Sequence, residues 1–249
     1  MPTIALQLYT VRDAMATDLH GTLQRVRDCG FEWVETAFFP EGIDFETGRR
    51  ALDAAGLRVR SAHLPLPDET NIDQLRGIAA VLGTSDIVWH GWPRDERHES
   101  AAGVDSLLDA YRTGNALASI HGLKLHLHNH WWEFDPNASE SIHSRILEET
   151  PLDLGLELDT YWALVAGQDP VECIQRAGDR ISLLHLKDGP GIPDATKLPL
   201  GAGVLPLNAI CAAAPRDSTW IVELDDFDGD IFDAIRTSRE RLDEELSHD

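Results

Sequence analysis

The strongest constraint on the fold is an alternation of short apolar runs with longer amphipathic segments, which continues along the whole 249-residue chain. Eight short runs have the length and apolar content of buried β-strands. These runs are Thr3–Leu8, Phe31–Thr36, Arg58–Leu64, Asp86–His90, Lys124–His130, Leu154–Asp159, Ile181–Lys187 and Thr219–Asp225. The segments between and after them space their apolar residues as helices do. They are Asp18–Asp28, Phe45–Ala55, Ile72–Leu82, Ala101–His121, Glu140–Glu149, Pro170–Ala177, Leu205–Ala213 and Ile231–Leu246.

Strands that alternate with helices are joined by right-handed crossovers and form a parallel sheet. Gly30, Gly56, Gly83 and Gly122 each stand between a predicted helix and the next strand, which is typical of helix C-caps. Eight such units in about 250 residues match a closed (β/α)8 barrel. We therefore predict an α/β fold with a single TIM barrel domain over residues 1–249. The alternative is a doubly wound open sheet, but QLYTVRDA lacks the GxGxxG turn of dinucleotide-binding sheets.

Composition and charge exclude several classes of protein. Hydrophobic residues make up 43% of the chain and charged residues 26%, as in folded rather than disordered proteins. The 43 acidic residues outnumber the 21 Lys and Arg residues, and the formal net charge is −22. A surface of that charge repels phosphate backbones and anionic lipids, so we expect neither nucleic acid nor membrane as a partner.

Cysteine usage and the amino-terminal segment predict a cytoplasmic protein. Cys29, Cys173 and Cys211 lie far apart and form no CxxC motif, which fits a reducing compartment. The start MPTIALQLYTVRDAM has neither the basic residues nor the long apolar run of a signal peptide. No stretch approaches the roughly 18 apolar residues that a membrane span needs.

The active site of a (β/α)8 barrel lies at the carboxyl-terminal ends of its strands, here called the mouth. In the fifth predicted strand, the two-residue period puts His126, His128 and His130 on one face, which we expect to line the lumen. The next three strands deliver further polar residues to the same face in pairs. These pairs are Glu157 and Asp159, His185 and Lys187, and Glu223 and Asp225.

Four consecutive strands thus bring imidazoles and carboxylates to one mouth, where burial without a partner would be costly. A divalent cation that binds them removes this cost. The nitrogen and oxygen ligands, without cysteine, suit Mn²⁺, Co²⁺, Zn²⁺ or Mg²⁺. For Lys187, the alternative to a functional role is a surface salt bridge with Asp188.

The first four strands end in polar residues that reach the same mouth. They are Gln7 and Tyr9, Glu35, His63 and His90, each of which could instead make an ordinary strand-end cap. Four tryptophans follow strand ends: Trp92, Trp131, Trp132 and Trp162. They form either loop packing or a water-excluding rim over a sugar-like ligand. The Gly- and Pro-rich segment Asp188–Gly203 is long enough to be a lid.

Several motifs together resemble the sugar phosphate isomerase/epimerase family, which comprises xylose isomerase-like TIM barrels. They are LQLYTVRD, RVRSAHL, HLHNHWWEF, LELDTYWALVAGQDPVE, LLHLKDG, GAGVLP and WIVELDD. The resemblance spans nearly the whole chain and points to the branch that carries HNHxxEF. Ala202 stands in GAG where relatives often have GEG, and Leu224 in ELD where many have EQD. These two departures affect the substrate pocket and not the ligand set.

The resemblance implies one divalent metal ion, with Mn²⁺ as the first choice and Co²⁺, Zn²⁺ or Mg²⁺ as alternatives. Asp159, His185 and Glu223 are the implied ligands. The strand-five ligand of the well-understood ketose epimerases is a glutamate, and our alignment puts His126 at its position. We prefer Glu133, which would reach back from the following loop, as the fourth ligand, with His128 as the alternative. The resemblance also allows a homo-oligomer.

The implied activity is isomerisation or epimerisation of a sugar or keto-sugar by proton abstraction next to a carbonyl, through an enediolate. Glu223, Glu133, His128 and His130 are the candidate catalytic residues. The candidate substrate-binding residues are Lys187, His63, Tyr9 and Trp162. Because no phosphate-binding Gly-rich turn is evident, we expect an unphosphorylated substrate.

Three other functions are open to this sequence. A dehydratase or lyase on an inosose or a 3-keto-glycoside would share the same intermediate. A non-catalytic sugar-binding barrel would use the same mouth without turnover. A DNA-repair endonuclease of the same superfamily needs a basic groove, which the net charge of −22 disfavours.

Overall fold

The fold is that of a computed structural model, which describes residues 2–134 and 141–247. Eight parallel strands pair in chain order and close into a barrel, because β1 pairs with both β2 and β8. The strands are β1 (Thr3–Gln7), β2 (Trp33–Thr36), β3 (Arg58–His63), β4 (Asp86–Trp89), β5 (Lys124–His128), β6 (Gly155–Asp159), β7 (Ile181–Leu186) and β8 (Thr219–Val222). The predicted (β/α)8 TIM barrel is confirmed.

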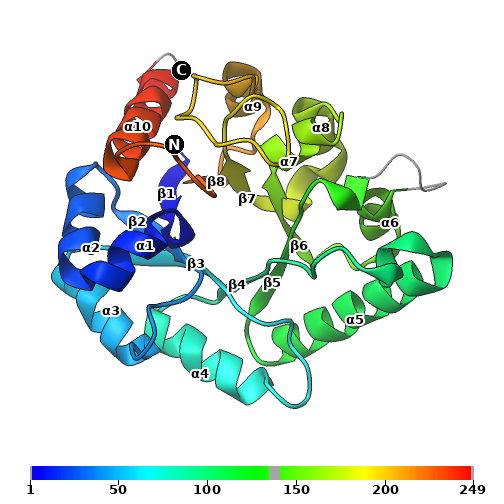
Figure 1. The fold of residues 1–249 in the computed structure, drawn as a ribbon. Coiled ribbons are helices and arrows are strands. Elements are labelled where there is room, and N and C mark those ends of the chain that lie inside the picture. The colour runs from blue at the N-terminus through cyan, green and yellow to red at the C-terminus, as the bar shows by residue number, and fades with distance from the viewer. Residues whose placement is uncertain (1, 135–140, 248–249) are drawn as a thin grey trace.

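Helices form an outer ring around these strands (Figure 1). They are α1 (Arg12–Thr17), α2 (Leu19–Asp28), α3 (Phe45–Ala54), α4 (Ile72–Leu82), α5 (Ala101–Ile120), α6 (Ile142–Glu149), α7 (Thr160–Val165), α8 (Pro170–Ala177), α9 (Leu207–Ala213) and α10 (Ile231–Ser247). Short 3-10 turns lie at Leu8–Val11, Glu96–Glu99, Trp132–Phe134 and Gly178–Arg180. None of the described helices is long and apolar enough to cross a membrane.

The observed elements differ from the predicted ones mainly at their ends. β5 stops at His128 and β8 at Val222, so His130, Glu223 and Asp225 follow strands instead of ending them. The predicted helix Glu140–Glu149 corresponds to α6, and its first residue lies outside the described residues. Helices α1 and α7 have no counterpart among the predicted helices.

Helix α7 was missed because it starts without a linker. Asp159 ends β6, and its carboxylate accepts a hydrogen bond from the Trp162 backbone N–H at 2.8 Å. This is N-capping, which satisfies one of the free amide groups at a helix start. One residue therefore ends a strand and begins a helix, and the sequence shows no turn residues between them.

The two faces of the strands have different contents. Outward leucines such as Leu125, Leu127 and Leu184 belong to the large apolar core under the helices. Inside the lumen, a small separate apolar cluster forms one layer. It consists of Ala5, Val88, Leu183 and Ile221. The polar residues that the two-residue period predicted to face inward lie above this layer, toward the mouth.

His126 also faces the lumen, but at its amino-terminal end. Its Nε2 lies 2.8 Å from Asp86 Oδ1, and its Nδ1 lies 3.2 Å from Ser182 Oγ. Gly155 makes room for the ring, since a Cβ at that position would lie 2.3 Å from His126 Nδ1. Arg60 completes the group with an ion pair of 2.6 Å to Asp86.

A single carboxylate makes four of the hydrogen bonds that hold the long segment after β7. Asp188 Oδ1 accepts hydrogen bonds from the backbone N–H groups of Gly189 and Leu205, and Oδ2 from those of Gly201 and Gly203. These bonds are 2.8–3.0 Å long. Asp188 also pairs with Leu198 in an isolated antiparallel bridge. The two ends of the predicted lid segment are therefore fastened to the barrel.

Candidate active site and metal centre

A cavity of about 510 Å³ opens at the mouth of the barrel. It is lined by residues from all around the barrel except β6, among them Gln7, Tyr9, Phe38, His63, Pro65, Trp89, His90, His128, His130, Trp162, Lys187, Glu223 and Asp225. Its volume is within the range of pockets that bind small molecules.

Two fully buried carboxylates form the floor beneath this cavity. Glu157 on β6 receives three imidazoles at its Oε2 atom: His63 Nε2 at 2.8 Å, His128 Nδ1 at 3.1 Å and His185 Nε2 at 3.1 Å. Glu35 on β2 contacts two of these histidines, His63 and His185, at the same Nε2 atoms. Its Oε1 atom is 2.7 Å from His185 Nε2 and 3.0 Å from His63 Nε2.

Glu35 is also hydrogen-bonded by neutral side chains. Gln7 Nε2 donates to Oε1 at 2.7 Å, and Ser61 Oγ donates to Oε2 at 2.5 Å. Because its neighbours all donate to it, Glu35 is stabilised as a carboxylate despite complete burial. Although burial raises the pKa of Glu35, the His63 and His185 imidazoles hold it well below its usual range.

Above the floor, Asp159, His185 and Glu223 offer ligand atoms that all lie within 4.8 Å of one another. Asp159 Oδ2 and His185 Nδ1 are buried and make no hydrogen bond within the part of the chain that the structure describes. This is so although His185 Nδ1 lies 2.7 Å from Glu223 Oε2. The close partners of these two atoms are ionic: Glu223 Oε2 for His185 Nδ1, and Lys187 Nζ at 3.1 Å for Asp159 Oδ2. Two carboxylates and an imidazole that converge in this way suit a divalent cation.

A second group, formed by His63, His128, Glu157 and His185, is equally compact. Its atoms differ because their hydrogen bonds are already made: His63 and His128 bond to Glu157 within the group, and His185 bonds to Glu35 outside it. We call Asp159, His185 and Glu223 the candidate centre, and the group around Glu157 is a second set of atoms that could hold an ion.

The ammonium group of Lys187 contacts three carboxylates, two of which belong to the candidate centre. Its Nζ is 3.1 Å from Asp159 Oδ2, 3.0 Å from Glu223 Oε2 and 2.9 Å from Asp225 Oδ1. Although burial lowers the pKa of Lys187, these three carboxylates raise it well above its usual range. The surface salt bridge considered as the alternative is ruled out by this burial. The three carboxylates around this ammonium group therefore stabilise a positive charge at the candidate centre.

The histidines of the site have opposite pKa shifts. Burial lowers the pKa of His63, but Glu35 and Glu157 raise it to about 10. Glu157 and Glu223 likewise raise the pKa of His185 well above its usual value, against the effect of burial. Burial and the neighbouring cationic groups, His185 foremost, lower the pKa of His128. His128 is therefore neutral at pH 7, and a ring nitrogen can bind a cation.

The carboxylates of the centre also differ from each other. Burial raises the pKa of Asp159, with Lys187 opposing it. For Glu223, Lys187 and His185 outweigh burial and lower the pKa. A divalent cation would favour the ionised form of both groups and displace the proton from His185 Nδ1, so its binding releases protons.

The structure brings most of the sequence-predicted site residues together. Lys187, His63, Tyr9 and Trp162 all line the cavity, as do Glu223, His128 and His130. Glu133 is placed differently. Its Oε2 accepts a hydrogen bond from the His130 backbone N–H at 2.9 Å, and the side chain stabilises the loop after β5. Neither compact group of ligand atoms among the described residues includes it.

Of the candidates for the fourth ligand, His128 lies nearest to the centre. Its Nε2 is 3.9 Å from Asp159 Oδ2, and its Nδ1 bonds to Glu157. His126 lies two residues deeper, and both its ring nitrogens have the partners described above. The structure therefore favours His128 over His126 at the centre.

The aromatic residues at the mouth form two layers. Trp162 and Trp89 line the cavity. Trp92 packs behind Trp89, at 4.9 Å between ring centroids, and Trp132 stacks on His130 at 4.1 Å. Of the four tryptophans for which loop packing and a rim were the two alternatives, Trp162 contacts the cavity directly. Trp89 was missed because it lies within a strand and not after one.

Glu35 was predicted to reach the mouth and Glu157 to share a face with Asp159, but neither was among the candidate catalytic, substrate-binding or ligand residues. The signal was present, since Glu157 has the same parity as Asp159 two residues later. Their role became visible only when strands far apart in sequence met across the lumen.

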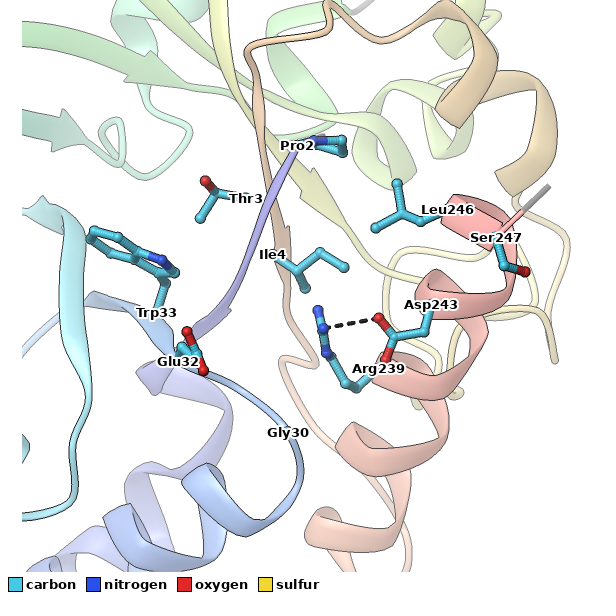
Figure 2. A pocket seen from close by; sticks show the side chains of 10 residues that line it. All are labelled: Pro2, Thr3, Ile4, Gly30, Glu32, Trp33, Arg239, Asp243, Leu246 and Ser247. Atoms are coloured by element: carbon cyan, nitrogen blue, oxygen red, sulfur yellow. Dashed lines mark ion pairs between the residues drawn. The ribbon is translucent and has the colours of Figure 1, made fainter. Parts of the chain in front are cut away.

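A second cavity of about 590 Å³ lies beside the amino-terminal ends of β1 and β2, against the end of α10 (Figure 2). It is lined by Pro2, Thr3, Ile4, Gly30, Glu32, Trp33, Arg239, Asp243, Leu246 and Ser247. No histidine is among these residues. Figure 2 shows an ion pair of 2.9 Å between Arg239 and Asp243, which both lie on α10.

A closed parallel barrel with imidazoles and carboxylates at its mouth defines a (β/α)8 protein with a candidate metal centre. The chain belongs to the xylose isomerase-like TIM barrel family, whose model matches residues 23–245. The family expected from the motifs is thereby confirmed, and the HNHxxEF branch stays a prediction. No curated protein matches the chain significantly.

Solved structures of similar fold cover nearly the whole chain. A sugar phosphate isomerase/epimerase from Parabacteroides distasonis ATCC 8503 is 24% identical, with a TM-score of 0.76 over 97% of this chain and 93% of that one. An L-ribulose 3-epimerase is 16% identical, with a TM-score of 0.73 over 100% and 95%. An IOLI protein with a bound zinc atom is 15% identical, with a TM-score of 0.72 over 99% and 98%. At these identities the likeness shows the fold.

Proposed function

We propose that this protein is a divalent-metal-dependent isomerase or epimerase that acts on an unphosphorylated sugar or keto-sugar. The observation that carries the proposal is the cluster of Asp159, His185 and Glu223, whose buried Asp159 Oδ2 and His185 Nδ1 make no hydrogen bond within the described chain. Membership of the xylose isomerase-like family supports it. So do similar structures named as an epimerase and as a protein with a bound zinc atom.

Asp159, His185 and Glu223 hold the ion, with His128 as the fourth ligand that the geometry favours. Glu133 is the fourth ligand favoured by the motif resemblance. Mn²⁺ is our first choice for this mixture of nitrogen and oxygen ligands, with Co²⁺, Zn²⁺ and Mg²⁺ as alternatives. When bound, such an ion acts as a Lewis acid toward neighbouring oxygens of the sugar and favours an enediolate.

The residues of the chain supply the proton transfer. Glu223 is ionised at neutral pH and lines the cavity from the β8 side, so its carboxylate can take a proton from the carbon next to the carbonyl. His128 and His130 line the cavity from the β5 side. Return of the proton from that side to the same carbon gives an epimer, and return to the neighbouring carbon gives an isomer.

The lining of the cavity favours an uncharged substrate. Lys187 is the one lysine or arginine among the lining residues that the structure describes, and three carboxylates already neutralise it. A phosphate group would find no free cation there. Tyr9, Trp162 and the neutral His90, whose pKa burial and His63 lower to about 4, offer surfaces and polar groups suited to a sugar.

The test is proton exchange in deuterated water with protein loaded with Mn²⁺, for a panel of ketoses, inososes and 3-keto sugars. We expect deuterium at the carbon next to the carbonyl, together with an epimer or isomer. A chelator should abolish the exchange, and Glu223→Gln should slow it by about 10²–10⁴-fold. Unchanged turnover of Glu223→Gln at full metal content would contradict its catalytic role.

The other outcomes identify the alternative functions. Loss of a hydroxyl or glycosyl group next to the exchanging carbon would show a dehydratase or lyase. Sugar binding without exchange by any substrate would show a non-catalytic barrel and would refute the proposed activity.

A further inference from the structure

The floor beneath the candidate metal centre is built around one carboxylate that no ligand set includes. Glu157 is completely buried, and its Oε2 atom is shared by His63, His128 and His185 at 2.8–3.1 Å. These three imidazoles come from β3, β5 and β7, which contact one another only through the lumen. Glu157 therefore links three strands at the level just below the centre.

Hydrogen-bond chemistry fixes where the imidazole protons lie. An ionised carboxylate only accepts hydrogen bonds, so each ring nitrogen that bonds to Glu157 or Glu35 must carry a hydrogen. The hydrogen of His128 is then on Nδ1, and that of His185 is on Nε2. The opposite nitrogens, His128 Nε2 and His185 Nδ1, are the ones that face Asp159 and Glu223.

We propose that Glu157 is a positioning residue that holds the distal proton of His128 and, together with Glu35, that of His185, so that both rings present a lone pair to one metal ion. This inference rests on the proposed metal centre. It assigns the group of His63, His128, Glu157 and His185 to hydrogen bonding beneath the ion and excludes it as a second ion site. Carboxylates behind metal-binding histidines orient the ring and raise its basicity, and their loss typically weakens metal binding 10–100-fold.

The barrel offers a matched control in the same lumen. Asp86 pairs with His126 at 2.8 Å, the same kind of carboxylate–imidazole contact, two residues deeper along β5. Neither residue contacts the candidate centre. Asp86→Asn therefore removes a carboxylate–imidazole contact of the same kind, at a partly exposed carboxylate, without touching the ligands.

The experiment measures the Co²⁺ stoichiometry, dissociation constant and visible absorption of the full-length protein, Glu157→Gln and Asp86→Asn. We expect one ion per chain in all three. Glu157→Gln should bind Co²⁺ about 10–100-fold more weakly with an altered absorption band. Asp86→Asn should keep the spectrum and the affinity within about twofold, because it is remote from the ligands.

Two results would overturn the inference. One is two ions per chain with one lost in Glu157→Gln, which would make Glu157 a ligand. The other is an unchanged affinity and spectrum in that variant. If Glu157→Gln does not fold, ¹⁵N-histidine spectra of the unmodified Zn²⁺-loaded protein decide instead. They should show a hydrogen on Nδ1 of His128 and on Nε2 of His185, and the opposite pattern would refute the inference.

The same data separate this inference from the proposed function. A protein that binds no divalent ion refutes the metal centre and both proposals with it. A protein that binds one ion and exchanges sugar protons, with Glu157→Gln indistinguishable from the parent, refutes the role of Glu157 alone.

Discussion

Each end of this barrel has a cavity, and the larger of the two is lined by fewer ionisable side chains. The cavity at the amino-terminal ends of β1 and β2 measures about 590 Å³, against about 510 Å³ at the mouth (Figure 2). Its charges are few, and Arg239 is paired with Asp243. At the mouth, by contrast, ionisable groups from β2, β3, β5, β6, β7 and β8 converge on a space of a few ångströms.

The contrast shows that the volume of a cavity does not identify a site. What distinguishes the mouth is the free energy that it costs to bury so many ionisable side chains. Buried carboxylates and imidazoles are unfavourable without a partner. At the amino-terminal end of the lumen, Asp86, Arg60 and His126 satisfy one another. At the mouth, Asp159 Oδ2 and His185 Nδ1 have ion-pair contacts, to Lys187 at 3.1 Å and to Glu223 at 2.7 Å, but no hydrogen bond of good geometry within the described chain.

The largest difference should come from a pair of substitutions, one beneath the cavity at the mouth and one in the other cavity. His185→Ala should abolish bound metal and lower turnover at least about a thousandfold, because it removes the ligand between Asp159 and Glu223. Arg239→Ala, in the other cavity, should leave both within about twofold. Metal analysis and sugar proton exchange measure the two variants. An equal loss in Arg239→Ala would remove the distinction between the two ends.

The second effect concerns the charge balance at the mouth. Lys187→Met leaves three carboxylates without their ammonium and should lower the free energy of unfolding of the metal-free protein by about 3 kcal/mol. It should also raise Mn²⁺ affinity, since a like charge is removed. Thermal unfolding with and without Mn²⁺ measures both. Weaker Mn²⁺ binding would show that Lys187 supports the ion instead of competing with it.

The third effect concerns the loop over the mouth. Asp188→Ala removes the acceptor of four backbone N–H groups and should cost about 2–4 kcal/mol in urea-induced unfolding. Limited proteolysis should then cut within residues 189–204. Asp194→Ala in the same loop is exposed and should change stability by no more than about 0.5 kcal/mol. Equal effects of the two substitutions would contradict the role of Asp188.

The smallest effect tests the paired charges at the opposite end. Although burial raises the pKa of Asp86, His126 and Arg60 lower it from its ordinary value of 3.8 to about 2. A lowered carboxylate pKa adds stability that is present above the unfolded value and lost as the pH falls toward the folded one. Stability should therefore fall by about 2 kcal/mol between pH 3.8 and 2. Asp86→Asn should flatten this part of the profile, and an unchanged slope would contradict the assignment.

Much of the site could be predicted from strand parity alone. Because side chains alternate between the faces of a strand, His128, Asp159 and His185 were expected in the lumen, where the structure places them. The fold followed from the eight alternating units, which left only the ends of elements to be corrected.

Depth along the lumen could not be predicted in this way. His126 and His128 have the same parity, and only the pairing of strands decides which one reaches the centre. His126 lies beside Gly155, while His128 lies beside Glu157, one layer nearer the mouth. That stagger is a property of the closed barrel and not of any one strand.

Local hydrogen bonding explains why Glu133 lies away from the centre. Its carboxylate bonds to the backbone N–H of His130, three residues earlier in the chain. Such short-range contacts compete with any long-range role of the side chain. The motif names the residue, but it does not show which of the two contacts is favoured.

The most direct test of the metal centre is elemental analysis of gently purified protein, beside Asp159→Asn and Glu133→Gln. We predict about one Mn, Co, Zn or Mg per chain in the parent, none in Asp159→Asn and full content in Glu133→Gln if His128 is the fourth ligand. A parent that binds no divalent ion even after reconstitution would contradict the metal centre, as would full metal content in Asp159→Asn.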